Sequence, residues 1–351
     1  MSTLATSILV VRQGRALGRA PRAGDATLAW IRRNDPLLAA RILVHETGTG
    51  AMPAVAAGAG AVVLWLPTGL RDRFPICYRE ASAICELAAR RGAVVVNPAG
   101  ALSEAAPRTR AALWAQAGLR CAPSHPYHNR MELEALLMSQ PAPVVVRPEW
   151  THTAQFARSR ADAVGVALAG WQCAGSLMPF VDTRDGERRE HPESVWALLY
   201  HRKRVYVCGD AVLPGEVLFS EAPVVRPENC TFQRYVGWRA LLQGVACVRR
   251  VEREAVAADL AFARAEPEHT EILRQAVGLL GLRFAAVDYS NGADGVPTLW
   301  SVDPCPDLLG WLSGGMPLLR RTTPRLTRFF ECTAAFLRGL IPDAIDRRRT
   351  A

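Results

Sequence analysis

The stretch Leu280–Leu309, LGLRFAAVDYSNGADGVPTLWSVDPCPDLL, decides how the second half of the chain folds. Two runs within it, Phe284–Tyr289 and Thr298–Val302, have the apolar and β-branched composition of strands. Asn-Gly and Asp-Gly turn residues lie between them, and Pro304 and Pro306 end the second run because proline cannot continue a central ladder. The stretch therefore predicts a β-hairpin.

Each predicted strand carries an acidic residue near its end, Asp288 on the first and Asp303 on the second. If the strands pair around the turn, both carboxylates lie near the same rim of a sheet. One or two carboxylates together with phosphates are the ligands that Mg²⁺ prefers. The alternative is that both acids make local hydrogen bonds in turns. The spacing by itself leaves both interpretations open.

The hairpin resembles the last hairpin of ATP-grasp enzymes, where a pattern of the form gxDy, dG and lxExNxxP delivers metal ligands. The matching segments are Ala286–Tyr289, Asp294-Gly295 and Leu299–Pro306. The resemblance implies ATP and Mg²⁺ as cofactors.

The chain departs from this pattern at two positions. Ser301 stands where the family has Glu, and Asp303 stands where it has Asn. The resemblance implies Asp288 and Asp303 as the metal ligands. The carboxylate ligand of the family pattern is therefore missing at Ser301, and a carboxylate replaces the weaker amide ligand at Asp303.

Further segments resemble the same family in the family's order. They are the strand exit Val94–Pro98, the helix end Gly118–Pro123, the strand Pro143–Pro148, the linker Leu177–Val181 and the strand pair around Arg202–Asp210. Before them, strand-like runs at Ser7–Arg12, Ile42–Val44, Ala61–Leu66 and Ala93–Val96, with a helix at Cys77–Arg91, predict a parallel α/β layer.

The fold expected from these observations is α/β, becoming α+β in the C-terminal part. A small Rossmann-like pre-domain, residues 1–100, precedes an ATP-grasp fold of two α+β subdomains, residues 101–176 and 177–345, the latter ending in a C-terminal helix. Helical spacing predicts further helices at Ser103–Ala117, Arg130–Ser139, Ser159–Trp171, Glu252–Ala265, His269–Leu280 and Pro324–Leu340.

Arginines stand where the family presents basic residues to phosphate. Arg147 lies within the apolar strand VVVRP, where a charge needs an anionic partner or an exposed strand end. Arg108 is the weaker candidate, near the helix that carries a phosphate-contacting lysine in the family. The alternative for Arg108 is a solvated helix face.

The string RKRVYVCGD resembles a family strand pair whose arginine binds phosphate or an acyl-phosphate intermediate. The resemblance implies a catalytic role for Arg204, with Arg202 and Lys203 as further cofactor-binding residues. We expect strands at Val195–Tyr200 and Val205–Cys208 on either side of these basic residues. The alternative is a solvated hairpin turn.

The linker of the family touches adenine with backbone atoms and the ribose with an acid. Met178, Phe180 and Asp182 are the matching positions, and an ordinary core strand is the alternative. The loop at 149–154 contains no glycine, so a close backbone cradle for phosphate is not expected.

The composition restricts the classes of molecule that we expect as partners. A net charge of +9 and a pI near 9.4 are consistent with anionic ligands. Lys203 is the only lysine, and the arginines are dispersed without the interleaved aromatics of a nucleic-acid surface, so no nucleic-acid partner is expected. Nine cysteines without a C-x-x-C pair indicate a reduced, cytoplasmic protein, and no run suits a signal peptide or membrane span.

Two functions from different classes follow. The first is an ATP-dependent carboxylate–amine or thiol ligase that forms an acyl phosphate, with a small-molecule or peptide substrate. The second is a degenerate ATP-grasp protein that binds a nucleotide or a protein partner without catalysis, as Ser301 and the glycine-free loop suggest. The sequence leaves open whether the protein forms a homo-oligomer. The fold alone does not decide between the two functions.

Overall fold

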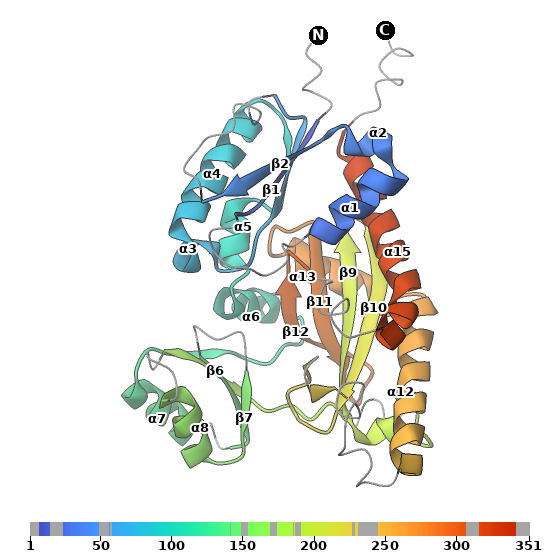
Figure 1. The fold of residues 1–351 in the computed structure, drawn as a ribbon. Helices are drawn as coiled ribbons and strands as arrows, with labels where there is room; N and C mark the ends of the chain where they lie inside the picture. Colours follow the sequence, from blue (N-terminus) through green and yellow to red (C-terminus); the bar gives the residue numbers. More distant parts are fainter. Residues whose placement is uncertain are drawn as a thin grey trace.

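The computed structural model describes residues 7–14, 24–48, 56, 58–140, 142–148, 154–168, 174–184, 186, 191–226, 229–230, 245–306 and 316–341. Its described strands form three four-stranded sheets, here called sheets A, B and C. Figure 1 shows sheet A at one end of the molecule, sheet B below it and sheet C beside the far end of sheet B.

Sheet A is the predicted parallel layer, with strand order β2-β1-β3-β4. Its strands are β1 (Ile8–Gln13), β2 (Ile42–Thr47), β3 (Ala61–Trp65) and β4 (Val94–Val96). The apolar runs of β1 and β3 are buried on both faces, as parallel strands between helices require.

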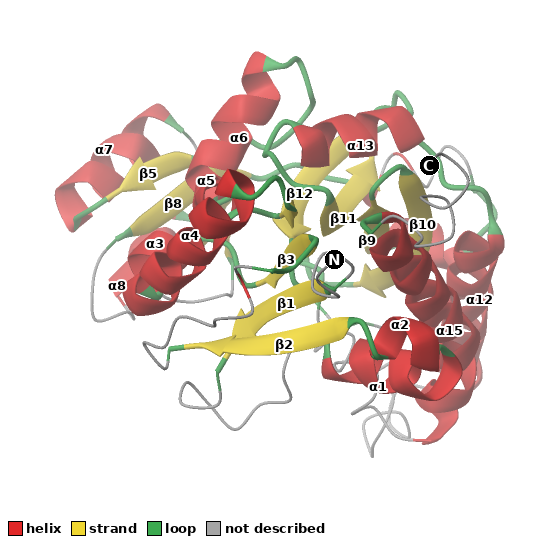
Figure 2. Ribbon diagram, turned by 90° about the horizontal axis from the view of Figure 1, so that it is seen from above, coloured by secondary structure: helices red, strands yellow, loops and turns green. Residues whose placement is uncertain are grey.

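Helices cover both faces of sheet A. The side chains of Leu9 and Val11 join one core with α4 (Pro75–Arg90) and α5 (Ala99–Glu104), near α3 (Leu70–Arg73). The alternate side chains of β1 pack with α1 (Asp25–Asn34), followed by α2 (Pro36–Ala39), and with α15 (Met316–Gly339). Figure 2 shows α1 beside α15 on one side of the molecule and α3 and α4 on the other.

Sheet C is antiparallel, with order β5-β8-β6-β7. It contains β5 (His125–Tyr127), β6 (Val144–Pro148), β7 (Gln155–Ala157) and β8 (Gly175–Pro179), and it packs against α7 (Arg130–Ser139) and α8 (Arg160–Leu168). The predicted helix Arg130–Ser139 is confirmed, and the Asn129 side chain caps it by accepting a hydrogen bond from the Glu132 amide.

Sheet B is antiparallel, with order β10-β9-β11-β12. Its strands are β9 (Tyr200–Cys208), β10 (Ala211–Ser220), β11 (Phe284–Asn291) and β12 (Pro297–Asp303). The predicted hairpin is β11 and β12, with a register shift between Asp288 and Tyr289. The helices α12 (Val245–Arg264) and α13 (Thr270–Gly278) follow the pair β9 and β10 in sequence, and both contact β10.

Two predicted elements differ from the structure. The predicted helix Ser103–Ala117 is two helices, α5 and α6 (Pro107–Gln116), because Pro107 starts a new helix at its first position. Ser103 does not cap a helix start, since its hydroxyl donates to the Ala99 carbonyl one turn earlier.

The second difference concerns the basic segment before Val205. The predicted strand Val195–Tyr200 is mostly a 3₁₀ turn, η4 (Val195–Leu198), and residues 201–204 lie inside β9 rather than between two strands. The chain turns at Gly209-Asp210, as its Gly-Asp sequence predicts, and Gly209 has a φ of 63°. Pairing of β9 with both β10 and β11 extends the strand through its charged residues.

Sheets A and B share hydrophobic cores, and one buried asparagine after β4 adds hydrogen bonds between them. Asn97, with a φ of 54°, accepts hydrogen bonds from the amides of Arg283 (3.0 Å) and Phe284 (3.2 Å) and donates to the Phe284 carbonyl at 2.6 Å. The predicted domain limits at residues 100, 176 and 345 stay predictions. None of the described helices is both long and apolar enough to cross a membrane.

Candidate anion-binding site

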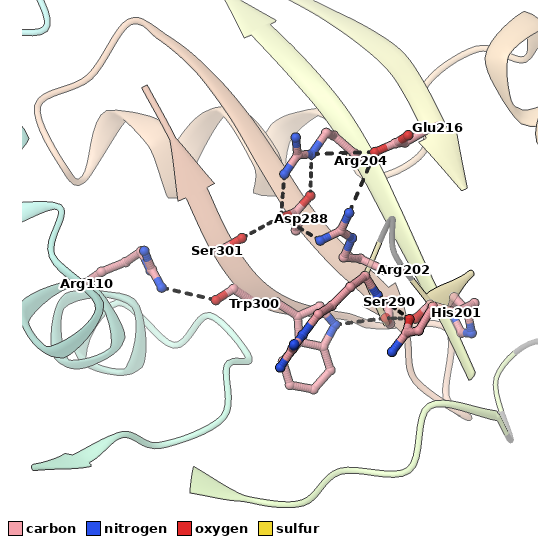
Figure 3. Close-up of polar contacts among 11 residues, drawn as sticks. Arg110, His201, Arg202, Arg204, Glu216, Asp288, Ser290, Trp300 and Ser301 are labelled. Atoms are coloured by element: carbon pink, nitrogen blue, oxygen red, sulfur yellow. Dashed lines mark hydrogen bonds and ion pairs between the residues drawn. The ribbon is translucent and has the colours of Figure 1, made fainter. Parts of the chain in front are cut away.

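Strand β9 presents two arginines to the same face of sheet B, because side chains two residues apart point the same way. Arg204 lies directly opposite Asp288 in the β9–β11 ladder. Its Nε donates to Asp288 Oδ1 at 2.7 Å and its Nη2 donates to Oδ2 at 3.0 Å, a two-pronged contact drawn in Figure 3. Arg202 Nη1 lies 3.8 Å from the same carboxylate.

Asp288 receives a third hydrogen bond from across the hairpin. Ser301 lies opposite it on β12, and the Ser301 hydroxyl donates to Asp288 Oδ2 at 2.5 Å. Burial alone would raise the pKa of Asp288, but the charges of Arg202 and Arg204 and the hydrogen bonds hold that pKa well below its usual range. Asp288 is therefore ionised, and both of its oxygens accept hydrogen bonds.

Glu216 on β10 is the second carboxylate of this face. It lies opposite Arg204 in the β9–β10 ladder, and only 2% of its surface is exposed. Its Oε1 lies 3.7 Å from Arg202 and 4.0 Å from Arg204, and its Oε2 has no hydrogen-bond partner. Burial raises the pKa of Glu216 to about 7, against the opposing effect of the two arginines.

Arg110 reaches the site from α6. It is 4% exposed, and it donates to the carbonyls of Trp300 at 3.2 Å and Ala105 at 3.4 Å, while its Nε has no partner. Figure 3 shows it pointing from its helix toward Trp300, beside the Asp288 contacts. Burial and the charge of Arg147 lower the pKa of Arg110 to about 9, so it is still charged at pH 7.

Arg147 approaches from sheet C. It lies on β6, partly buried, and its Nε has no hydrogen-bond partner. Burial lowers the pKa of Arg147, the charge of Asp288 raises it, and the charge of Arg226 lowers it further. Arg147 is therefore a fourth positive charge within electrostatic reach of Asp288.

These four arginines, Arg110, Arg147, Arg202 and Arg204, are called the arginine cluster below. All four interact electrostatically with Asp288, and two of them interact with Glu216. Four positive groups thus face two carboxylates, one of which has a pKa of about 7. Positive charge away from water is costly unless it is paired, so the cluster is suited to a further anion.

Lys203, the remaining basic candidate on β9, faces away from this cluster. Lys203 points to the opposite face of β9, where its Nζ lies 3.4 Å from Glu268 Oε2 and 5.9 Å from the Phe262 ring centre. Arg108 lies in α6, and its side chain is outside what the structure describes. Residues 149–153 of the glycine-free loop are also outside the described residues.

Asp303 does not lie opposite Asp288. The ladder pairs it with Ala286, and its Oδ1 accepts a hydrogen bond from the Cys305 amide at 3.0 Å, a local turn contact of the kind the sequence left open.

The predicted linker continues from β8 toward β9. Met178 pairs with Val145 inside sheet C. The Phe180 ring packs edge-on against Phe156, at 4.9 Å between centres, and against Tyr200, at 5.9 Å. Asp182 accepts hydrogen bonds from the Arg184 Nε at 2.9 and 3.1 Å. These contacts leave the adenine and ribose roles as predictions.

The residues present do not fit Mg²⁺ held by protein carboxylates. Both oxygens of Asp288 are bonded to Arg204, and Ser301 supplies a hydroxyl donor where a second acid would be needed. Within the described ranges, no group of three or more His, Cys, Asp or Glu side chains could hold a metal ion. The metal roles of Asp288 and Asp303 stay predictions, and this geometry does not support them.

Sequence reasoning missed Arg110 and Glu216. Arg110 stands two residues beyond the candidate Arg108, and only the packing of α6 on β12 distinguishes the two. Glu216 follows a register shift in β10, between Pro214 and Glu216, and no sequence motif predicts this shift. The signal available in the sequence was that Glu216 is an acidic residue inside an otherwise apolar strand.

No family model matches the chain, and a search of curated proteins finds no match. The solved structures similar to it include the ATP-grasp ligase PsnB complexed with minimal precursor, Mg and ADP, with a TM-score of 0.52, 16% identity, and coverage of 93% of this chain and 99% of that one.

Two further solved structures have the same similarity. The RimK domain protein ATP-grasp from Sphaerobacter thermophilus has a TM-score of 0.52 and 14% identity, and the match covers 95% of this chain and 99% of that one. D-cycloserine synthetase DcsG has a TM-score of 0.52 and 15% identity, covering 92% and 99%. At these identities the likeness concerns the fold, and the fold predicted from the sequence is confirmed.

Proposed function

We propose that this chain, which has the ATP-grasp fold, binds a nucleotide such as ATP through its phosphates at the arginine cluster. One observation carries the proposal: four arginines from sheets B and C and from α6 act electrostatically on Asp288, and among the described residues they share Asp288 and Glu216 as their carboxylate partners at this face. A phosphate chain would supply the missing negative charge.

Arginine suits this task because its planar fork of N–H donors matches phosphate oxygens. Among the residues that the structure describes, the Nε atoms of Arg110, Arg147 and Arg202 have no hydrogen-bond partner, so these guanidinium groups retain donor capacity. Arg110 and Arg147 would approach the phosphates from α6 and sheet C, while Arg202 and Arg204 would hold them from sheet B. In the same pose, Met178 and Phe180 would lie along adenine, with Asp182 at the ribose.

A second candidate is ligation, favoured by two of the similar structures, which are an ATP-grasp ligase bound to a precursor and a D-cycloserine synthetase. A substrate carboxylate oxygen would attack the γ-phosphorus, ADP would leave, and an amine or thiol would then displace phosphate from the acyl phosphate. Arg204 would stabilise charge on the transferred group. The substrate would be a small molecule or a peptide.

Calorimetry with ATP on the full chain tests nucleotide binding. Arg147→Gln and Arg202→Gln should each weaken binding by about tenfold or more, because each removes a charged donor worth about 1.4 kcal/mol or more. Arg90→Gln is the matched control, since it removes the same charge from a side chain that is 78% exposed. Absence of ATP binding at millimolar concentration, or equal loss in the control, would contradict the proposal.

Ligation is tested separately by following ADP release. Turnover that requires both a carboxylate and an amine, and that Arg204→Gln abolishes, would establish the second candidate. ATP binding without turnover across a panel of amino acids and peptides would favour a binding role alone.

A further inference from the structure

We infer that the phosphate site of this chain operates without a divalent cation, because Arg204 and Ser301 close the position at which Asp288 would bind one. The inference rests on the proposed function and goes beyond it, since it names the source of the charge that neutralises the phosphates. That source is the arginine cluster.

The first step is the engagement of Asp288. Its carboxylate is 3% exposed, and it accepts two hydrogen bonds from Arg204 and one from Ser301. A cation that takes both carboxylate oxygens must displace the guanidinium from this buried pair. Arg204 would then keep its charge without its carboxylate partner, which is a costly arrangement away from water.

The second step is the lack of a companion ligand. The residue opposite Asp288 in the hairpin is Ser301, whose hydroxyl donates its hydrogen to Asp288 instead of offering a charged oxygen. Asp303 lies opposite Ala286 and accepts a hydrogen bond from the Cys305 amide. The hairpin therefore places one carboxylate, already paired, where a Mg²⁺ site requires hard oxygen ligands with open coordination.

The third step is electrostatic. Arg202 and Arg204 are bonded to or within 4 Å of both Asp288 and Glu216. A divalent cation at Asp288 would meet these positive charges at short range, and the repulsion is strong in a partly buried site. The same charges attract phosphate oxygens directly.

The first experiment compares ATP binding by the full chain in EDTA and in excess Mg²⁺. The expected dissociation constants differ by less than about threefold. Binding that is tenfold or more tighter with Mg²⁺ would overturn the inference and leave the proposed nucleotide binding intact.

A second measurement decides the inference even if ATP does not bind. Mn²⁺ is titrated into the chain without nucleotide and followed by electron paramagnetic resonance. We expect no bound Mn²⁺ at micromolar concentrations. Mn²⁺ that binds wild type and is released by Asp288→Asn would overturn the inference. ATP that fails to bind in both EDTA and Mg²⁺ would overturn the proposed function alone.

A gain-of-binding variant tests the two residues that close the position. Ser301→Glu combined with Arg204→Gln restores an acid opposite Asp288 and removes the guanidinium, so it should bind Mn²⁺ at least tenfold more tightly than wild type. Val296→Glu with Arg90→Gln makes the same two charge changes at positions that are exposed, and should bind none. A folded Ser301→Glu/Arg204→Gln protein that binds no Mn²⁺ would contradict the assignment of the closure to these residues.

Discussion

Arg204 on β9 and Asp288 on β11 lie opposite each other in one ladder, and Arg204 donates two hydrogen bonds to the Asp288 carboxylate, at 2.7 and 3.0 Å. The pair joins residues 84 positions apart in the sequence. It neutralises the acid that the family resemblance connects with a metal, and it holds one end of the arginine cluster in place. Both the proposed anion site and its stability depend on this contact.

Breaking the pair from one side should destabilise the protein. Asp288→Asn leaves Arg204 without its carboxylate, and the loss of one partner from a buried pair costs about 3–5 kcal/mol. Urea unfolding measures the free energy.

The double variant Asp288→Asn/Arg204→Gln should recover part of that loss, because neither residue then leaves an unpaired charge. Additive effects of the two substitutions would show that the pair contributes no coupling.

Glu216 should make the protein less stable as the pH rises. Its pKa is about 7 in the folded chain and 4.5 as an ordinary Glu, so between these values the folded state binds the proton more tightly. The stabilisation is complete below pH 4.5 and is lost as the pH rises through 7. Glu216→Gln should therefore be more stable than wild type at pH 8, by on the order of 3 kcal/mol, and similar to it at pH 4.5.

Unfolding free energies at the two pH values check this prediction. The charged groups that act on Glu216 are Arg204, Arg202, Asp259 and Asp288, all unchanged in the variant. An advantage of Glu216→Gln that is the same at pH 4.5 and pH 8 would show that the carboxyl does not titrate in this range.

His201 should have the opposite effect at low pH. Burial and the charge of Lys203 lower the pKa of His201 from 6.5 to about 3, so the unfolded chain binds the proton more tightly between these values. Its contribution is present above pH 6.5 and is lost as the pH falls toward 3. His201→Gln, which retains an acceptor for the Asn291 amide, should lose less stability than wild type between pH 7 and pH 4.5, by about 2–3 kcal/mol.

Thermal melting at pH 7 and pH 4.5 tests the His201 prediction. His128→Gln is the matched control, because that histidine is exposed and lies at the start of α7. Equal acid sensitivity of wild type and His201→Gln would rule out the buried histidine as a source of acid lability.

Asn97 should be needed for the contact between sheets A and B. Asn97→Ala removes the partner of the Arg283 amide and of the buried Phe284 amide, and places a Cβ-bearing apolar residue at a φ of 54°, so it should cost about 3 kcal/mol or more. Asn97→Gly loses the same hydrogen bonds without the backbone strain and should cost about 1 kcal/mol less. Denaturant unfolding measures the free energy of unfolding of both variants. A glycine variant that is no more stable than the alanine variant would refute the strain argument.

The sequence by itself determined the elements and their order. Continuous apolar and β-branched runs predicted β1, β3, β6, β11 and β12, and helical spacing predicted α4, α7 and α13, because these signals are local. The order of motifs predicted the ATP-grasp fold. Arg147, Arg202, Arg204 and Asp288 were all candidates before the structure, and the fold brings their charges together.

Tertiary structure alone decided which charges face one another. The segment His201–Arg204 was expected between two strands, yet pairing with β10 and β11 makes it one strand, which turns Lys203 away from Arg202 and Arg204. Arg110 and Glu216 enter the site only through the packing of α6 and the register of β10. The reason is physical: ladder register and burial are set by contacts between distant segments, and these contacts decide which groups lose water and which partners they find.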